Sequence, residues 1–140
     1  PWRIGVQDPA RAEEAEAYTG ILRMTDGFAV TSGGYQRYFE EDGVTYHHII
    51  DPATGRPAES GLTSVTVVAD GTVGNGTMCD ALSTALFVMG EERALDFWRS
   101  GAYDFDLILV TEDGRLLVTD GIADQFQPDE TAGYAYEVVS

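Results

Sequence analysis

The chain is poor in side chains that act as nucleophiles, bases or cations: it has no lysine, one cysteine and two histidines among 140 residues. It has eight basic residues, all arginine, and 24 acidic residues, which gives a net charge of −16. Such a charge repels phosphate backbones and anionic lipids, so nucleic acid is not an expected partner. The single cysteine, Cys79, excludes an internal disulfide and does not indicate a compartment.

An apolar run of roughly 18 residues and a charged-then-apolar leader are also missing. We therefore expect that these residues do not cross a membrane and that any signal or lipid anchor lies outside them. The 44% apolar content and the length suit one folded domain with a core. An anionic ligand would need local help from a metal ion, a helix N-terminus or an arginine such as Arg37 or Arg56. The alternative for these two arginines is an ion pair with a surface carboxylate.

Strand patterns separated by turn residues stand on both sides of two helical patterns. Helices are expected at 77–89 and 91–99, divided by Gly90. Strands are expected at 2–6, 21–25, 28–31, 35–40, 44–50, 62–69, 106–111, 115–119 and 134–139. The early strands follow one another closely, as in an antiparallel meander. This order predicts an α+β domain, with an antiparallel sheet and two central helices packed on it.

Both histidines lie at the end of one apolar strand pattern, directly before the turn sequence Asp-Pro-Ala-Thr-Gly. Alternation places His48 and Ile50 on one face of the strand, and His47 and Asp51 on the other. Only one imidazole can therefore face a given cleft, where it would suit a general base better than a shared metal site. The alternative is that both are packed or surface imidazoles.

A second polar feature is a narrow stripe on the otherwise apolar helical pattern. Asp80 and Thr84 are four residues apart and stack on one helix face, with Ser83 beside them. A carboxylate and a hydroxyl at this spacing can share one hard cation, and Mg²⁺ suits two oxygen ligands completed by water and phosphate. Alternatively, Thr77 and Asp80 form a capping box, and Thr84 bonds the carbonyl four residues back.

The segment from Thr31 to Tyr35 combines hydroxyls with two adjacent glycines. Glycine lets a ligand or a strand approach the backbone closely, and Ser32 supplies a hydroxyl at that point. The alternative is an ordinary hairpin turn.

Four stretches taken in order resemble a known family: Thr-Ser-Gly at 31–33, His-Ile-Ile-Asp-Pro-x-Thr-Gly at 48–55, Ser-Val-Thr-Val-Val at 64–68, and Asp-Ala-Leu-Ser-Thr-Ala-Leu at 80–86. Together with the opening residues 1–9, they are similar to the ApbE family of FAD:protein FMN transferases. The resemblance covers essentially the whole chain.

The resemblance implies Mg²⁺-dependent transfer of FMN from FAD to a threonine hydroxyl of a partner flavoprotein, a subunit of an electron-transport complex or reductase. It implies that His48 is the base that activates this hydroxyl and that Asp80 and Thr84 are Mg²⁺ ligands. The alternatives are an FAD pyrophosphatase, which releases FMN and AMP, and a non-catalytic flavin-binding or interaction module. Residues expected to bind or surround FAD are Ile50, Ser32, Gly33, Asp51, Thr54 and Gly55.

The family also implies an architecture, in which this chain resembles the second of two tandem T-fold-like units. Residues 1–140 would then be the C-terminal part of the transferase domain. The absent N-terminal part would carry much of the FAD pocket and another Mg²⁺ ligand, so we expect the isolated chain to fold without transferase activity. Family members suggest an extracytoplasmic, periplasmic or cell-surface lipoprotein, attached to the membrane through an anchor outside these residues.

Overall fold

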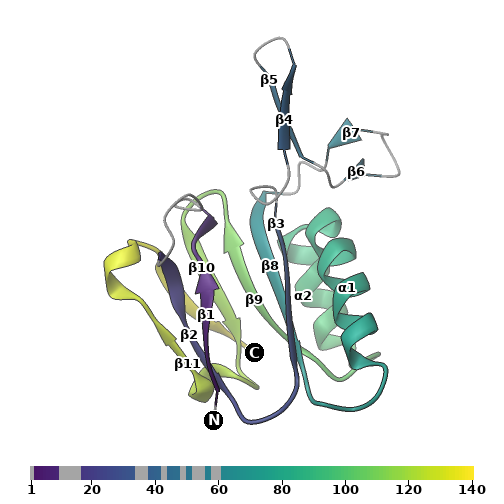
Figure 1. The fold of residues 1–140 in the computed structure, drawn as a ribbon, viewed down its shortest axis with the longest axis vertical. Coiled ribbons are helices and arrows are strands. Elements are labelled where there is room, and N and C mark those ends of the chain that lie inside the picture. The colour runs from purple at the N-terminus through teal and green to yellow at the C-terminus, as the bar shows by residue number, and fades with distance from the viewer. Residues whose placement is uncertain are drawn as a thin grey trace.

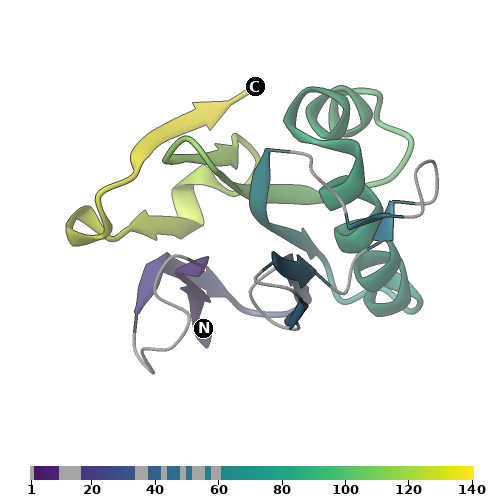
Figure 2. The ribbon, with the colours of Figure 1, turned by 90° about the horizontal axis from the view of Figure 1, so that it is seen from above.

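The computed structural model describes residues 2–9, 17–33, 38–41, 44–47, 50–51, 56–57 and 61–140. These residues form a main sheet with two helices on one face and a smaller sheet on the other (Figure 1, Figure 2). The expected α+β architecture is confirmed. None of the helices in these ranges is long and apolar enough to cross a membrane.

The main sheet has five strands in the order β12-β10-β9-β8-β3. Its neighbours are antiparallel except for β10 and β12, which are parallel. After β10 the chain crosses to the second sheet before returning, so β12 enters in the same direction as β10. Bounds are β3 Phe28–Gly33, β8 Leu62–Ala69, β9 Asp106–Thr111, β10 Arg115–Thr119 and β12 Ala135–Val139.

The second sheet corrects the expected meander, because β2 does not pair with β3. It contains β1 (Trp2–Gln7), β2 (Tyr18–Met24) and β11 (Phe126–Pro128), in the order β1-β2-β11. The strands β8 and β9 are buried along almost their whole length, and a strand buried on both faces needs a layer on each side. The second sheet supplies that layer, while β3 crosses to pair with β8.

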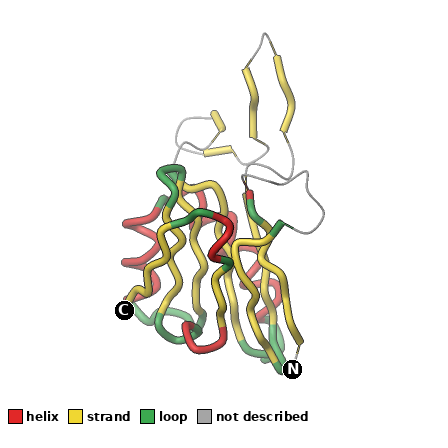
Figure 3. The backbone as a smooth tube through the Cα atoms, turned by 90° about the vertical axis from the view of Figure 1, so that its left-hand side faces the viewer, coloured by secondary structure: helices red, strands yellow, loops and turns green. Residues whose placement is uncertain are grey.

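Two short ribbons follow β3 in the chain and lie beyond one end of the main sheet (Figure 1, Figure 3). The strands β4 (Tyr38–Glu41) and β5 (Val44–His47) pair antiparallel, as do β6 (Ile50–Asp51) and β7 (Arg56–Pro57). The single strand expected at 44–50 is thus assigned only in part, since 48 and 49 lie outside the described residues.

The helices confirm the two expected at the centre of the chain. Helix α1 (Asn75–Met89) begins two residues earlier than expected, and α2 is Glu91–Arg99. Between them Gly90 has φ 88°, in the left-handed region that glycine adopts without strain. Two further 3₁₀ turns, η2 (Ala123–Gln125) and η3 (Glu130–Ala132), connect the last strands.

Two apolar cores hold the three layers together. One lies between the helices and the main sheet and includes Phe87, Leu86 and Val67, all essentially fully buried. The other lies between the two sheets and includes Leu22 and Ile108, which are also fully buried.

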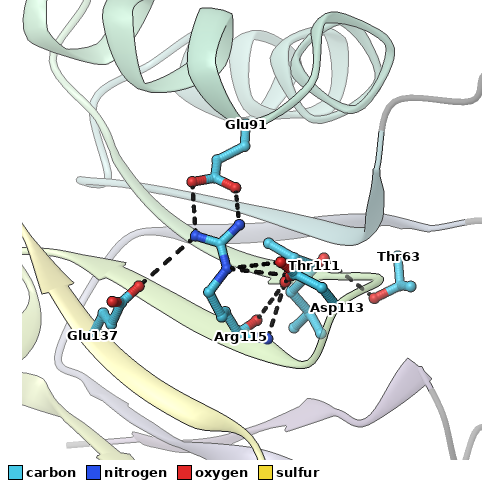
Figure 4. A network of polar contacts seen from close by, with 7 residues as sticks. Thr63, Glu91, Thr111, Asp113, Arg115 and Glu137 are labelled. Carbon is cyan, nitrogen blue, oxygen red and sulfur yellow. Dashed lines mark hydrogen bonds and ion pairs between the residues drawn. The ribbon is translucent and has the colours of Figure 1, made fainter.

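A polar network fastens the start of α2 to the main sheet (Figure 4). The guanidinium of Arg115 at the start of β10 makes a two-pronged contact with Glu91, with Nη1 3.0 Å from Oε2. Its Nε donates to Asp113 in the adjoining turn at 3.2 Å, and Nη1 lies 3.8 Å from Glu137 on β12. These contacts raise the pKa of Arg115, with Glu91 as the main cause. Arg115 therefore links helix α2, the β9–β10 hairpin and the last strand, β12.

Candidate functional site

Two of the predicted stretches meet in space, the end of β3 and the middle of α1. The helix packs along β3 and β8, beginning beside Phe28: a Cβ added at Gly76 would lie 3.0 Å from the Phe28 ring. Further along the same helix, Ser83 and Thr84 reach Ser32, near the other end of the strand. Residues about 50 positions apart in the sequence thus form one cluster of hydroxyl groups.

Hydrogen bonds connect the members of this cluster. The Oγ of Ser32 lies 2.7 Å from Oγ of Ser83 and 3.3 Å from Oγ1 of Thr84. Ser83 also donates to the backbone carbonyl of Asp80, at 3.0 Å. Ser83 is fully buried and Ser32 is 8% exposed, so the bond between the two serines is shielded from solvent, whereas the Thr84 side chain is exposed.

Asp80 and Thr84 are exposed on the helix surface, next to this buried pair. The capping interpretation of Asp80 is wrong, because α1 begins at Asn75 after Gly74 and no side chain caps it. Asp80 consequently lies beyond the first turn. For Thr84, the contact formed is with Ser32, and Ser83 is the side chain that bonds the Asp80 carbonyl. Asp80 therefore does not cap the helix, and the hydrogen bond described for Thr84 is to Ser32 rather than to the carbonyl four residues back.

The donor set on this face fits a magnesium ion. Mg²⁺ prefers oxygen ligands, retains several waters and is usually held by one or two carboxylates plus substrate phosphates. Asp80 offers one carboxylate and Thr84 one hydroxyl. Within the described ranges, no group of three or more histidine, cysteine or acidic side chains is placed to hold a metal. Any further ligands would come from water, from a bound phosphate or from residues beyond these ranges.

The cysteine before Asp80 takes no part in this face. Cys79 is fully buried in the core between helix and sheet, and this burial raises the pKa of its thiol. A neutral buried thiol is neither a nucleophile nor a metal ligand at neutral pH. Cys79 therefore acts as a small apolar side chain that holds α1 on the sheet.

The other predicted site residues divide into three groups. Gly33 ends β3 and pairs with Ser64 on β8. Ile50 and Asp51 form β6, opposite Pro57 and Arg56. His48, Thr54 and Gly55 lie outside the described residues, so their roles stay predictions.

Sequence reasoning treated Ser83 only as a neighbour of the polar stripe, and Ser32 as part of a rim. The structure turns both side chains towards each other between α1 and β3. One signal was present in the sequence: a serine among apolar residues of a core-facing helix needs a partner for its hydroxyl when buried. The identity of that partner is a matter of tertiary packing.

Comparison with known proteins points to one family. The family model described as "ApbE family" matches residues 1–109, which include every predicted site residue. An FAD:protein FMN transferase from Treponema pallidum is 39% identical over 124 residues, covering 89% of this chain and 32% of that relative. One from Vibrio cholerae is 40% identical over 114 residues, covering 81% of this chain and 32% of that relative.

Solved structures agree with the sequence comparison. The ApbE protein from Thermotoga maritima is similar with a TM-score of 0.65 at 40% identity, covering 94% of this chain and 37% of that one. The flavin transferase ApbE from Vibrio cholerae has a TM-score of 0.60 at 31% identity, covering 92% and 35%. The chain spans about a third of the length of the curated relatives named above. On the extent of the family match, this chain belongs to the ApbE family.

Proposed function

We propose that this chain provides the metal-binding and acceptor-activating part of an FAD:protein FMN transferase. The reaction would move FMN from FAD to a threonine hydroxyl of a partner flavoprotein, with release of AMP. The observation that carries the proposal is that an exposed carboxylate and an exposed hydroxyl, Asp80 and Thr84, lie one turn apart on one helix. A hydrogen bond to Ser32 on β3 holds that helix at Thr84. The named relatives of the chain are FAD:protein FMN transferases.

The charge of the chain supports a role for a cation. A net charge of −16 opposes the approach of a pyrophosphate, so the phosphates of FAD need local neutralisation. Asp80 and Thr84 would hold Mg²⁺, which when bound neutralises charge on phosphate oxygens. The exposed position of both side chains leaves their oxygens accessible to the ion.

The remaining requirement is a positioned acceptor hydroxyl. Phosphoryl transfer depends mainly on alignment and charge stabilisation, and a general base typically contributes about 10²–10⁴-fold. We assign the base to His48, whose neutral imidazole would accept the threonine proton. We assign contacts with FAD to the neighbouring turn and strands, through Ile50, Ser32, Gly33, Asp51, Thr54 and Gly55.

The experiment is a segment exchange, since the chain spans a third of its relatives. Residues 1–140 replace the matching segment of the Vibrio cholerae FAD:protein FMN transferase, and the chimera is incubated with FAD, MgCl₂ and an acceptor flavoprotein subunit. Covalent flavin is read by in-gel fluorescence and AMP by chromatography. We expect a fluorescent acceptor together with AMP, and neither product from the 140-residue chain alone.

Single substitutions in the chimera test the assigned roles. Asp80→Asn and Thr84→Val should each reduce labelling and raise the Mg²⁺ concentration needed. Thr77→Val, at an exposed threonine of the same helix, is the matched control and should match the parent. His48→Ala should retain FAD binding while labelling falls by about 10²-fold or more.

Three results would count against the proposal. Free FMN and AMP without a labelled acceptor would indicate hydrolysis. Neither product, with FAD still bound, would indicate a non-catalytic flavin-binding module. Efficient labelling by residues 1–140 alone would contradict the inactivity of the isolated chain.

A further inference from the structure

We propose that Ser32 and Ser83 are positioning residues for Thr84, and that they orient its hydroxyl through a one-directional chain of hydrogen bonds. The inference rests on the proposed function, because it concerns how Thr84 is prepared to bind a cation. It extends the site from the exposed helix face into the buried contact between α1 and β3.

The direction of the chain follows from counting protons. A hydroxyl has one proton to donate, and a carbonyl oxygen can only accept. Ser83 uses its proton on the Asp80 carbonyl, at 3.0 Å. The 2.7 Å bond between Ser83 and Ser32 must then use the proton of Ser32. The 3.3 Å contact between Ser32 and Thr84 is consequently left to the proton of Thr84.

This order determines what Thr84 presents to solvent. With its proton directed inwards to Ser32, Thr84 turns lone pairs outwards. One helical turn earlier, Asp80 presents a carboxylate, which only accepts hydrogen bonds when ionised. The outer face thus consists of acceptor oxygens, which suits a cation and disfavours direct contact with a phosphate oxygen.

The chain also joins the two proposed ligand residues. It starts at the Thr84 side chain, passes through β3 at Ser32, returns to α1 at Ser83 and ends on the Asp80 backbone. Burial of the two serines removes water that would otherwise compete for the protons of Ser32 and Ser83. Groups that orient metal ligands in this way typically contribute about 10–100-fold to metal affinity.

The test measures Mn²⁺ affinity, as a spectroscopic substitute for Mg²⁺, by electron paramagnetic resonance titration. The hosts are the 140-residue chain and the chimera described above. Ser32→Ala removes the acceptor for the Thr84 proton and should weaken binding by about 10-fold or more. Ser83→Ala leaves that acceptor but frees the Ser32 proton to turn towards Thr84, so a smaller loss is expected. Ser32→Thr keeps a hydroxyl and should restore affinity.

A matched control lies on β3 and β8. Thr31 and Thr66 form another hydroxyl pair, 2.8 Å apart, which links the two strands rather than a strand and the helix. Thr66→Val removes that pair and should leave Mn²⁺ affinity unchanged. Thermal unfolding in EDTA shows whether each variant is folded before its affinity is interpreted.

The outcomes separate this inference from the proposed function. Binding that Asp80→Asn abolishes, but that both serine-to-alanine variants retain at parental affinity, would overturn the inference alone. Equal losses for Thr66→Val and Ser32→Ala would overturn it too, since general loosening would then explain the effect. No Mn²⁺ binding dependent on Asp80 in either host would overturn the metal role and the inference together.

Discussion

Two buried serines in this fold are expected to respond oppositely to the same substitution. Ser64 on β8 is 1% exposed, and its Oγ has no hydrogen-bond partner among the described residues. Ser83 on α1 is fully buried and has hydrogen bonds to Ser32 and to the Asp80 carbonyl. The pair therefore contrasts a hydroxyl that has hydrogen-bond partners with one that has none in the described part of the chain, at similar burial and with the same side chain.

The magnitudes follow from the energetics of buried hydroxyls. An unsatisfied buried polar group costs about 1–3 kcal/mol, and a satisfied one contributes about 1 kcal/mol. Ser64→Ala should therefore stabilise the fold by about 1–2 kcal/mol, after a small loss of dispersion contacts. Ser83→Ala should destabilise it by about 1 kcal/mol. For a chain of 140 residues the unfolding entropy is about 0.3 kcal/mol/K, so 1 kcal/mol shifts Tm by about 3 °C.

The assay is urea unfolding followed by far-UV circular dichroism, with Tm from calorimetry as a second measure. Both variants should unfold with the parental m-value, because neither substitution changes the surface exposed on unfolding appreciably. If Ser64→Ala destabilises the protein as much as Ser83→Ala does, the reasoning fails, since its hydroxyl would then have a partner in solution.

Three further changes test the packing, a turn and the electrostatics. Phe87→Ala should destabilise the fold by about 3–5 kcal/mol in urea unfolding, because Phe87 is 1% exposed in the core under the helices; a loss under about 1 kcal/mol would contradict this packing. Gly27→Ala should lower the free energy of unfolding by about 1–3 kcal/mol or more. Gly27 has φ 134°, and a Cβ at this position would lie 2.3 Å from the Ala69 carbonyl oxygen, so the substitution introduces strain. Gly114→Ala, at φ 88° in open space, should cost less, and equal losses would refute the steric argument. Burial raises the pKa of Asp106, so its stabilising contribution is complete below pH about 3.9 and lost as pH rises through the raised pKa. Asp106→Asn should accordingly be more stable than the parent at pH 7, with the difference disappearing towards pH 3 in urea titrations, and a pH-independent difference would refute this.

Much of the local structure could be predicted because its causes are local. The strand-forming residues of β8 and β9 and the 3.6-residue periodicity of α1 lie within short segments, and all three elements are present. The same periodicity is sufficient to place Asp80 and Thr84 on one helix face. Helix bounds differed by two residues at the start of α1, where Gly74 rather than a polar side chain precedes the helix.

The pairing of distant segments was not predictable in this way. Adjacent patterns suggested that β2 pairs with β3, yet β2 lies between β1 and β11, and the strand at 126–128 was not expected. The strands β8 and β9, which are buried on both faces, required a second covering layer, but no local pattern showed which strands would form it. The parallel pairing of β10 and β12 likewise depends on the path of the chain through the second sheet.

The composition of the candidate metal face follows from the primary structure, because a spacing of four residues on a helix puts two side chains together whatever surrounds them. The contact of Ser32 with Ser83 and Thr84, across about 50 residues of chain, arises from the packing of the fold. The physical reason is that a buried hydroxyl is costly without a hydrogen-bond partner, while its own segment does not specify which partner it meets. Packing of α1 along β3 made that choice, and it gave the Thr84 hydroxyl its direction.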